Sequence, residues 1–367
     1  MKVLKVSRKK YELAFNHYVI SLIVFFALAL FACENKSKTI RNPQVDAFKQ
    51  CEHLGRGTNF GNILYRDGHF GVIVYNNDNW NKEKEQKEFE HIKEIGLNHV
   101  RICIGPFGYA DEKPHYILSK NFFERLDWTI DKALSQGLAV IIDQHEYEAM
   151  SDDPIGLKEI FLSTWKQIAE HYKDYPDNVY FGVLNEPHGN LTPYLWNYLC
   201  LDAINVIRSS NPNRTLVIGP GTWNNKESLQ YLKLPENDRN IIVEFHYYLP
   251  FHFTHQGTEW AEGSDEWVGT KWTGSQEEKQ AIADDFKIAV DWAKLNKRPL
   301  YLGEFGAYYK GDLESRALWL KSVIQLAENN KIAWAMWDMM GPYFGIYDES
   351  TESWIEPLKN VIMSLSK

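Results

Sequence analysis

The sequence predicts a single (β/α)8 barrel, and three observations support this prediction. From residue 51 onward, eight short apolar runs alternate with amphipathic stretches, and a polar or titratable residue closes almost every run at the same end. Strands that alternate with helices favour parallel βαβ units, and eight such units favour a closed barrel. A doubly wound open sheet is the alternative, but the sequence contains no glycine-rich nucleotide-binding motif of the GxGxxG or GxxxxGK[ST] type.

The expected strands have the length that is typical of buried strands, about five to seven residues. They cover residues 54–60, 98–104, 139–144, 179–184, 215–219, 241–246, 300–304 and 333–337. Apolar residues at helical spacing predict helices over 83–95, 122–136, 155–172, 194–209, 276–295 and 312–329, with a weaker pattern at 228–232. The first two patterns end at Gly96 and Gly137, and glycine commonly terminates helices.

The amino terminus has the pattern of a targeting segment. Five Lys and Arg residues within residues 2–10 precede an apolar run at 19–32, which is too short for a membrane span of about 20 residues. The run ends in Leu30-Phe31-Ala32-Cys33, which resembles a bacterial lipobox and implies lipid attachment at Cys33. We therefore expect a lipoprotein signal peptide at 1–32, a flexible tether at 33–50, a barrel domain at 51–367, and export to the bacterial cell envelope with a lipid anchor. An ordinary signal peptide with an unmodified Cys33 is the alternative.

Charge and cysteine usage exclude several classes of function. The net charge of −9 argues against nucleic-acid binding and against a strongly anionic polysaccharide, so a neutral substrate fits best. Cys51, Cys103 and Cys200 are scattered, which predicts neither a zinc site nor a disulfide framework and leaves at least one free thiol. We expect no metal, no cofactor and a monomer. The high aromatic content of 14% fits either a large core or a sugar-binding cleft.

Polar side chains close the expected strands at the end where active sites form in this fold. They are Arg101, His145, Asn185, Glu186, His246, Tyr248, Glu304 and Trp337. Taken singly, Glu186 could cap a helix, Glu304 could pair with an arginine, and His246 could be a core histidine. Together, Glu186 and Glu304 follow the fourth and seventh strands, so we expect them to face each other across the barrel mouth.

A pair of carboxyls about 5–5.5 Å apart is what a retaining glycosidase requires: one is the nucleophile and the other the acid/base. Near such a pair, Asn185 could bind the 2-hydroxyl of the sugar, and Arg101 and Tyr248 could donate to the nucleophile. His246 could shape the electrostatics beside the acid, and Trp337 offers a flat surface for the sugar ring.

Other residues are assigned with alternatives open. Trp223 follows the fifth strand and is expected to bind substrate. Trp260, Trp267 and Trp272 either line the cleft or pack their loop on the barrel. The strand positions of two further carboxylates, Asp143 and Glu244, predict buried structural acceptors.

These motifs resemble glycoside hydrolase family 5 of clan A. The resemblance rests on Leu184-Asn185-Glu186-Pro187, His246-Tyr247-Tyr248, Gly303-Glu304-Phe305-Gly306 and Trp337. It implies that Glu186 is the acid/base and that Glu304 is the nucleophile. The positions that match the rest of the family's active site are Arg101, His145, Asn185, His246, Tyr248 and Trp337.

A closer likeness exists to thermophilic endoglucanases of this family that also cleave mannan. It includes the start of the barrel, 57–62, where Asn59 matches a substrate-binding position. Tyr65 and Glu146 depart from those enzymes, at positions where a glutamate and a second histidine are usual, so mannan cleavage stays open. The leading hypothesis is endo-acting hydrolysis of β-1,4-glucan or glucomannan. The alternatives are a mannanase, a xyloglucanase or an exo-acting glycosidase of the family, and a surface lipoprotein that binds glycan without cutting it.

Overall fold

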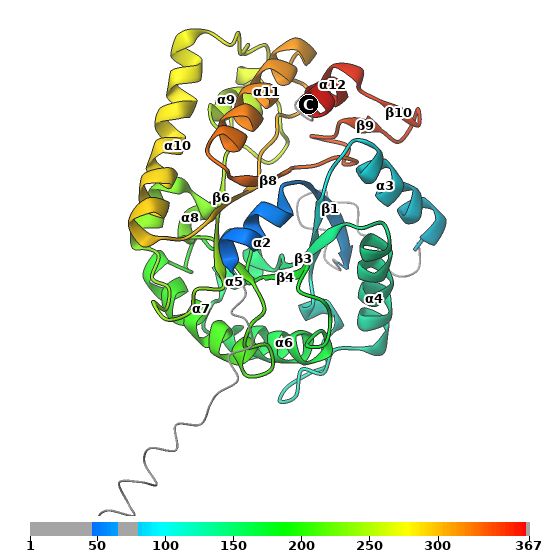
Figure 1. Ribbon diagram of the computed structural model, residues 1–367, viewed down its shortest axis with the longest axis vertical. Helices are drawn as coiled ribbons and strands as arrows, with labels where there is room; N and C mark the ends of the chain where they lie inside the picture. Colours follow the sequence, from blue (N-terminus) through cyan, green and yellow to red (C-terminus); the bar gives the residue numbers. More distant parts are fainter. Residues whose placement is uncertain (1–45, 65–79, 365–367) are drawn as a thin grey trace, which may run out of the picture. The chain divides into compact units, whose positions relative to one another are not determined.

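Eight parallel strands close into a barrel in the order β1-β2-β3-β4-β5-β6-β7-β8, as the sequence predicts (Figure 1). The computed structural model describes residues 46–64 and 80–364. The predicted signal peptide, Cys33, most of the predicted tether and Tyr65 lie outside the described residues.

The strands of the barrel agree closely with the expected apolar runs. They are β1 (Arg56–Leu64), β2 (His99–Ile104), β3 (Ala139–Gln144), β4 (Val179–Gly182), β5 (Leu216–Ile218), β6 (Ile241–His246), β7 (Leu300–Glu304) and β8 (Ala333–Met336). A small antiparallel pair, β9 (Tyr347–Asp348) and β10 (Ser353–Trp354), follows β8.

Helices connect the strands around the barrel. The α-helices are α2 (Ala47–Leu54), α3 (Lys82–Glu94), α4 (Lys120–Ser135), α5 (Tyr147–Asp152), α6 (Lys158–His171), α7 (Pro193–Arg208), α8 (Gly221–Asn224), α9 (Phe251–Thr254), α10 (Gln276–Asn296), α11 (Leu313–Asn329) and α12 (Glu356–Ser364). Three 3-10 helices, η3 (Phe107–Tyr109), η4 (Lys226–Tyr231) and η5 (Ser264–Trp267), lie in the loops. The helix predicted at 155–172 corresponds to α6, and the weak pattern at 228–232 corresponds to the 3-10 helix η4.

The ends of the helices follow from local sequence. Ser275 accepts from the N–H of Glu278, whose side chain bonds back to the N–H of Ser275, so a capping box begins α10. Gly96 and Gly137 follow α3 and α4 with φ of 84° and 73°, which confirms the two predicted stops.

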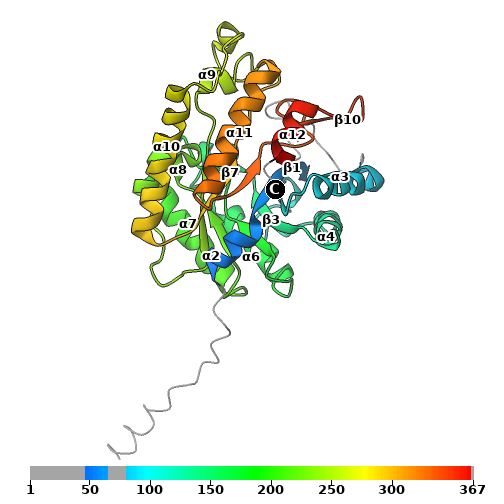
Figure 2. The ribbon, with the colours of Figure 1, turned by 45° about the horizontal axis from the view of Figure 1, so that its top comes forward.

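The first helix corrects the predicted tether. α2 begins at Ala47 after the N-cap Asp46, so residues 47–50 are helical and not part of a flexible segment. Ala47, Cys51 and Leu54 are spaced for one helix face, and they pack with the first residues of the strands to cover the amino-terminal end of the barrel. Figure 2 shows α2 at one end of the barrel and α9 at the other. Burial of this face explains why a helix of two turns is stable here.

Glycines make room for charged side chains inside the barrel. A Cβ at Gly182 would lie 2.5 Å from Asp143 Oδ1, and one at Gly303 would collide with the carboxylate of Glu244. Asp143 and Glu244 are 0% and 1% exposed, so both are buried acceptors as predicted. A polar layer therefore lies beneath the carboxyl ends of the strands, above the apolar layer that α2 covers.

Two further features concern the cysteines and the hydropathy of the helices. Cys51, Cys103 and Cys200 are all buried and free, which confirms the expected free thiol. Among the helices of residues 46–64 and 80–364, none has the length and apolar character needed to cross a membrane.

Candidate active site

A long cleft opens at the carboxyl ends of the strands, where the sequence places the site. Its volume is about 1720 Å³, well above the roughly 300–1,000 Å³ of most small-molecule sites. Glu186, Glu304, His246 and Trp337 all line it. The cleft is therefore large enough for several linked sugar units rather than for one.

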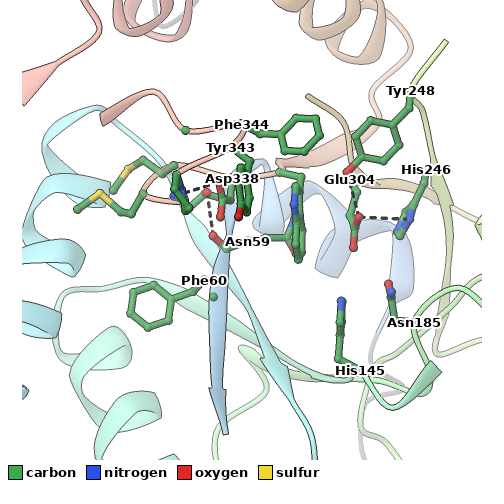
Figure 3. A pocket seen from close by; sticks show the side chains of 18 of the residues that line it. Asn59, Phe60, His145, Asn185, His246, Tyr248, Glu304, Asp338, Tyr343 and Phe344 are labelled. Atoms are coloured by element: carbon green, nitrogen blue, oxygen red, sulfur yellow. Dashed lines mark hydrogen bonds and ion pairs between the residues drawn. The ribbon is translucent and has the colours of Figure 1, made fainter. Parts of the chain in front are cut away.

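Glu304 reaches this cleft because of an irregularity in β7. The register between β6 and β7 runs from Phe245 opposite Leu302 directly to His246 opposite Glu304, so β7 has one extra residue. Such bulges re-aim a side chain near active sites. Here the bulge brings Glu304 level with His246, as Figure 3 shows.

Two donors hold the carboxylate of Glu304. Arg101 Nη1 donates to its Oε1 at 3.0 Å, and the hydroxyl of Tyr248 donates to its Oε2 at 3.0 Å. Both contacts were expected from the sequence. Burial raises the pKa of Glu304, and the carboxylate of Glu186 adds to this rise, while His246 and Arg101 oppose it.

Glu186 lies across the cleft floor from Glu304. One carboxylate oxygen of each, together with a ring nitrogen of His246, lie within 4.8 Å of one another. Glu186 has a φ of 37°, in the left-handed region that is costly for a residue with a Cβ. Its carbonyl oxygen bonds to Nδ1 of His188 at 2.8 Å, which helps to hold this conformation. Strain of this kind concentrates at functional sites.

Arg101 is the centre of the polar layer. It is fully buried, and its guanidinium pairs with three carboxylates: Asp143 at 3.1 Å, Glu244 at 3.2 Å and Glu304 at 3.0 Å. Burial lowers the pKa of Arg101, but these carboxylates outweigh burial and raise it above its usual value. The arginine is therefore a permanent cation beneath the site.

His246 is a second cation at the site. Its Nδ1 lies 2.7 Å from Glu186 Oε1 and its Nε2 lies 3.3 Å from Glu244 Oε1. Burial lowers the pKa of His246, but the carboxylates of Glu304, Glu186 and Glu244 outweigh burial and raise it to about 10. An imidazolium then donates to Glu186 and lies 3.7 Å from Glu304.

Asn185 and Asn59 both accept a hydrogen bond from Arg101, but they differ in the other contacts of their side-chain amides. Asn185 Oδ1 accepts from Arg101 at 2.7 Å, and its amide N–H groups remain for a ligand. Asn59 accepts from Arg101 at 2.9 Å and also donates both amide hydrogens, to the carbonyls of Gly303 and Met336. Asn59 therefore positions Arg101, and because it also lines the cleft, its role in binding substrate stays a prediction.

His145 and Trp337 form one wall of the cleft. Their rings are stacked with centroids 5.7 Å apart and planes 7° apart. Burial lowers the pKa of His145 to about 3, so its ring is neutral, and its Nδ1 bonds to Asp143 at 2.7 Å. Trp337 lines the cleft, and stacking of its indole on a sugar ring stays a prediction.

The rim after β5 has an unusual backbone. Thr222, Trp223 and Asn224 have φ values of 61°, 54° and 51°, three successive residues in the left-handed region. This run places Trp223 at the rim, where it is 51% exposed and stacks on His188 at 4.4 Å. It also buries Asn224, whose amide lies 3.3 Å from Nε2 of His246. Sequence reasoning missed Asn224, and its only signal was its place directly after Trp223.

Trp260, Trp267 and Trp272 were expected either to line the cleft or to pack their loop on the barrel. Trp260 lines the cleft and is 38% exposed. Trp272 is 1% exposed and belongs to the core, while Trp267 stacks on His252 at 4.3 Å. Of the two departures from the family pattern, Glu146 is described, and its Oε1 accepts from the backbone N–H of Phe107 at 2.9 Å.

The geometry would allow a metal ion at two places in the described residues, but the chemistry does not favour one. Glu186, His246 and Glu304 form one group, and Cys103, Asp143 and His145 form the other. A histidine ligates through a neutral imidazole, and a cysteine through its thiolate. The raised pKa of His246 keeps a proton on each ring nitrogen, and burial raises the pKa of Cys103 well above its usual value.

A parallel barrel with two close glutamates at its carboxyl end, set in a long cleft with aromatic walls, has the features of a glycoside hydrolase. The comparison with protein families agrees: the model described as cellulase (glycosyl hydrolase family 5) matches residues 64–341. The chain belongs to glycosyl hydrolase family 5 and is an endoglucanase-like glycoside hydrolase.

Several relatives support this assignment. Endoglucanase H of Acetivibrio thermocellus is 30% identical over 325 residues, which cover 87% of this chain and 34% of that protein. The chain thus spans about a third of the length of Endoglucanase H. Endoglucanase C of the same organism is 27% identical over 331 residues, covering 79% of this chain and 93% of that protein. The crystal structure of Cel5A of Thermotoga maritima with mannotriose is 43% identical, with a TM-score of 0.80, and the match covers 86% of this chain and all of that one.

Proposed function

We propose that this protein is a retaining endo-β-1,4-glucanase, with Glu304 as nucleophile and Glu186 as acid/base. The observation that carries the proposal is the separation of the two carboxyls, whose nearest oxygens lie within 4.8 Å. Inverting enzymes hold the pair about 6.5–9.5 Å apart to leave room for water, while retaining enzymes hold it about 5–5.5 Å apart.

The donors around the pair support the division of roles. A double displacement needs one carboxylate that is ionised and a partner that carries the proton. Glu304 accepts hydrogen bonds from Arg101 and Tyr248, and its carboxylate also lies close to the cation of His246. These donors stabilise a negative charge on Glu304. Glu304 is therefore assigned as the nucleophile, and Glu186 as the residue that gives a proton to the leaving group.

The reaction follows in two displacements. The Glu304 carboxylate attacks the anomeric carbon, the bond to the leaving oxygen breaks, and Glu186 transfers its proton to that oxygen. Glu186, now ionised, takes a proton from water, and the water oxygen displaces Glu304 from the sugar. The free amide of Asn185 is available to bind the 2-hydroxyl as charge develops on the ring.

Endo action on a glucan is supported by the cleft and by the relatives. A cleft of about 1720 Å³ accommodates a stretch of polymer, and relatives over most of the chain are endoglucanases. Cleavage of mannan or glucomannan is a second candidate, favoured by the likeness to Cel5A of Thermotoga maritima, whose structure holds mannotriose.

Product release from a panel of soluble polysaccharides tests this function. The panel contains β-1,4-glucan, mixed-linkage glucan, xyloglucan, glucomannan and mannan, each incubated with wild type and with Glu304→Gln. We expect mixed oligosaccharides early from wild type on glucans, and no turnover by a folded Glu304→Gln protein. Turnover by this variant would overturn the assignment of the nucleophile. A single small product throughout would indicate exo action, and binding without any release would favour a glycan-binding protein.

We also propose that the protein is exported, anchored by a lipid on Cys33, and active as a monomer. The support for export and the anchor is the lipobox-like Leu30-Phe31-Ala32-Cys33 after a short apolar run. Membrane partition of a Cys33→Ser variant tests the anchor. Release into the soluble fraction is expected, and unchanged partition would mean that the apolar run anchors the chain directly.

A further inference from the structure

Aromatic side chains gather on the outside of the barrel, on α7 and η4. Tyr194 and Tyr198 are 68% and 70% exposed, and Tyr231 is 42% exposed. Tyr194 and Tyr198 are four residues apart in α7, so they lie about 6 Å apart along one face of the helix. The ring of Tyr231 lies 6.1 Å from that of Tyr194. We call these three residues the tyrosine patch.

The backbone beneath the tyrosine patch is fixed by one side chain. Asn197 donates to the carbonyl of Tyr231 at 2.9 Å and accepts from the N–H of Lys233 at 2.8 Å. It therefore ties η4 to α7 between the exposed rings. Pre-positioned rings lose less entropy when a ligand binds, which favours binding.

The tyrosine patch continues from the rim of the cleft. Trp223, at the rim, is two residues after Gly221, and a Cβ at Gly221 would lie 3.0 Å from Cα of Pro193. Pro193 directly precedes Tyr194 at the start of α7. The helices α7 and α8 lie side by side in both views (Figures 1 and 2). Exposed aromatic rings therefore lead from the cleft onto the outer side of the barrel.

The chemistry of the tyrosine patch fits a carbohydrate better than a protein partner. Tyrosine offers a flat apolar face and a polar hydroxyl. Leu201 of α7 is 43% exposed, but the other neighbours in the sequence are polar: Gln230 is exposed, and Asp202 forms an ion pair with Lys158 at 2.6 Å. A protein-binding surface would have a desolvated apolar centre instead. The C–H face of a neutral sugar stacks on such rings while its hydroxyls stay in water.

We propose that the tyrosine patch is a second binding site for the polysaccharide substrate, which holds a stretch of chain outside the catalytic cleft. The inference rests on the proposed function, because it takes the same neutral β-linked polymer as ligand. Two linked sites raise the local concentration of the polymer at the cleft, whereas a short oligosaccharide reaches the cleft alone.

Binding to polymer, measured without hydrolysis, tests the site. The Glu304→Gln protein, with and without Tyr194→Ala plus Tyr198→Ala, is run in native gels that contain soluble β-1,4-glucan, to give an affinity for the polymer. We expect an affinity about tenfold lower when both rings are removed, since each aromatic contact contributes a few-fold. The matched control is Phe48→Ala, another exposed aromatic of a helix, 54% exposed on α2, and we expect it to leave the affinity unchanged.

A second readout uses active protein with Glu304 intact. The double tyrosine variant should hydrolyse a short chromogenic cello-oligosaccharide at the wild-type rate and lose rate only on polymer. Equal polymer affinity with and without the rings would overturn the site, as would equal losses on short and long substrates. Wild-type dimers that the variant lacks would identify the patch as a contact between copies instead. Failure of the proposed function is a separate result, because then wild type would release no product from any glucan.

Discussion

Replacing His246 with Gln tests the electrostatics that divide the roles of the two glutamates. The substitution keeps a hydrogen-bonding side chain but removes a positive charge. At 3.7 Å from Glu304, and with an effective dielectric constant of about 20, that charge stabilises the carboxylate by about 4 kcal/mol, or about three pKa units. His246 also serves Glu186 and Glu244, so the share that Glu304 receives is smaller.

The expected result is a change in the pH profile of kcat/KM. Loss of the cation raises the pKa of the ionised carboxylate in the free enzyme, so the acidic limb moves to higher pH. We expect a shift of about 1–2 pH units, together with a lower maximum. Initial rates on a soluble glucan between pH 4 and pH 9 give this limb directly.

His255→Gln is the matched control. His255 also lines the cleft, but burial lowers its pKa to about 3, so it is neutral over the whole assay range. Its replacement removes a ring of the same size without removing a charge, and the acidic limb should stay where it is. A limb that does not move in His246→Gln, or that moves equally in both variants, would refute the charge assigned to His246.

Two further substitutions test the support beneath the site. Gly303→Ala should destabilise the fold by about 1–3 kcal/mol in thermal or denaturant unfolding, because the new methyl group meets the Glu244 carboxylate. The control is Gly61→Ala, where a Cβ meets no described residue within 4 Å, and it should change stability by less than about 0.5 kcal/mol. Equal stability of the two variants would contradict the packing described for the polar layer. Asn59→Ala should lower kcat by about 10–100-fold with little change in KM, because it removes a hydrogen bond to Arg101 and not to substrate. A rise in KM alone would instead support the predicted role of Asn59 in binding substrate.

The sequence predicted the barrel well because its strands are apolar and its helices end at clear signals. All eight strands occur where apolar runs were expected, and Gly96 and Gly137 stop α3 and α4. The helix α2 was missed because it has only two turns and owes its stability to burial against the barrel floor. That burial is a tertiary contact, which local patterns do not report.

The sequence predicted which residues form the site but not how their side chains are arranged. Strand position placed Glu186, Glu304 and His246 at one end of the barrel. The bulge in β7 that brings Glu304 level with His246, and the left-handed run at 222–224, contradict local propensity and depend on surrounding packing. For the same reason the sequence did not show that Asn224 lies beside His246, or that Asn59 bonds to Arg101, Gly303 and Met336.

The stereochemistry of the first product distinguishes a covalent intermediate on Glu304 from direct attack by water. Proton NMR during early hydrolysis of a soluble β-1,4-glucan distinguishes the two anomers before they interconvert. Two displacements through Glu304 retain configuration, so we expect the β-anomer to appear first and the α-anomer only later, by mutarotation. If the α-anomer appears first, water attacks the sugar directly, and the proposed role of Glu304 as a covalent nucleophile is wrong.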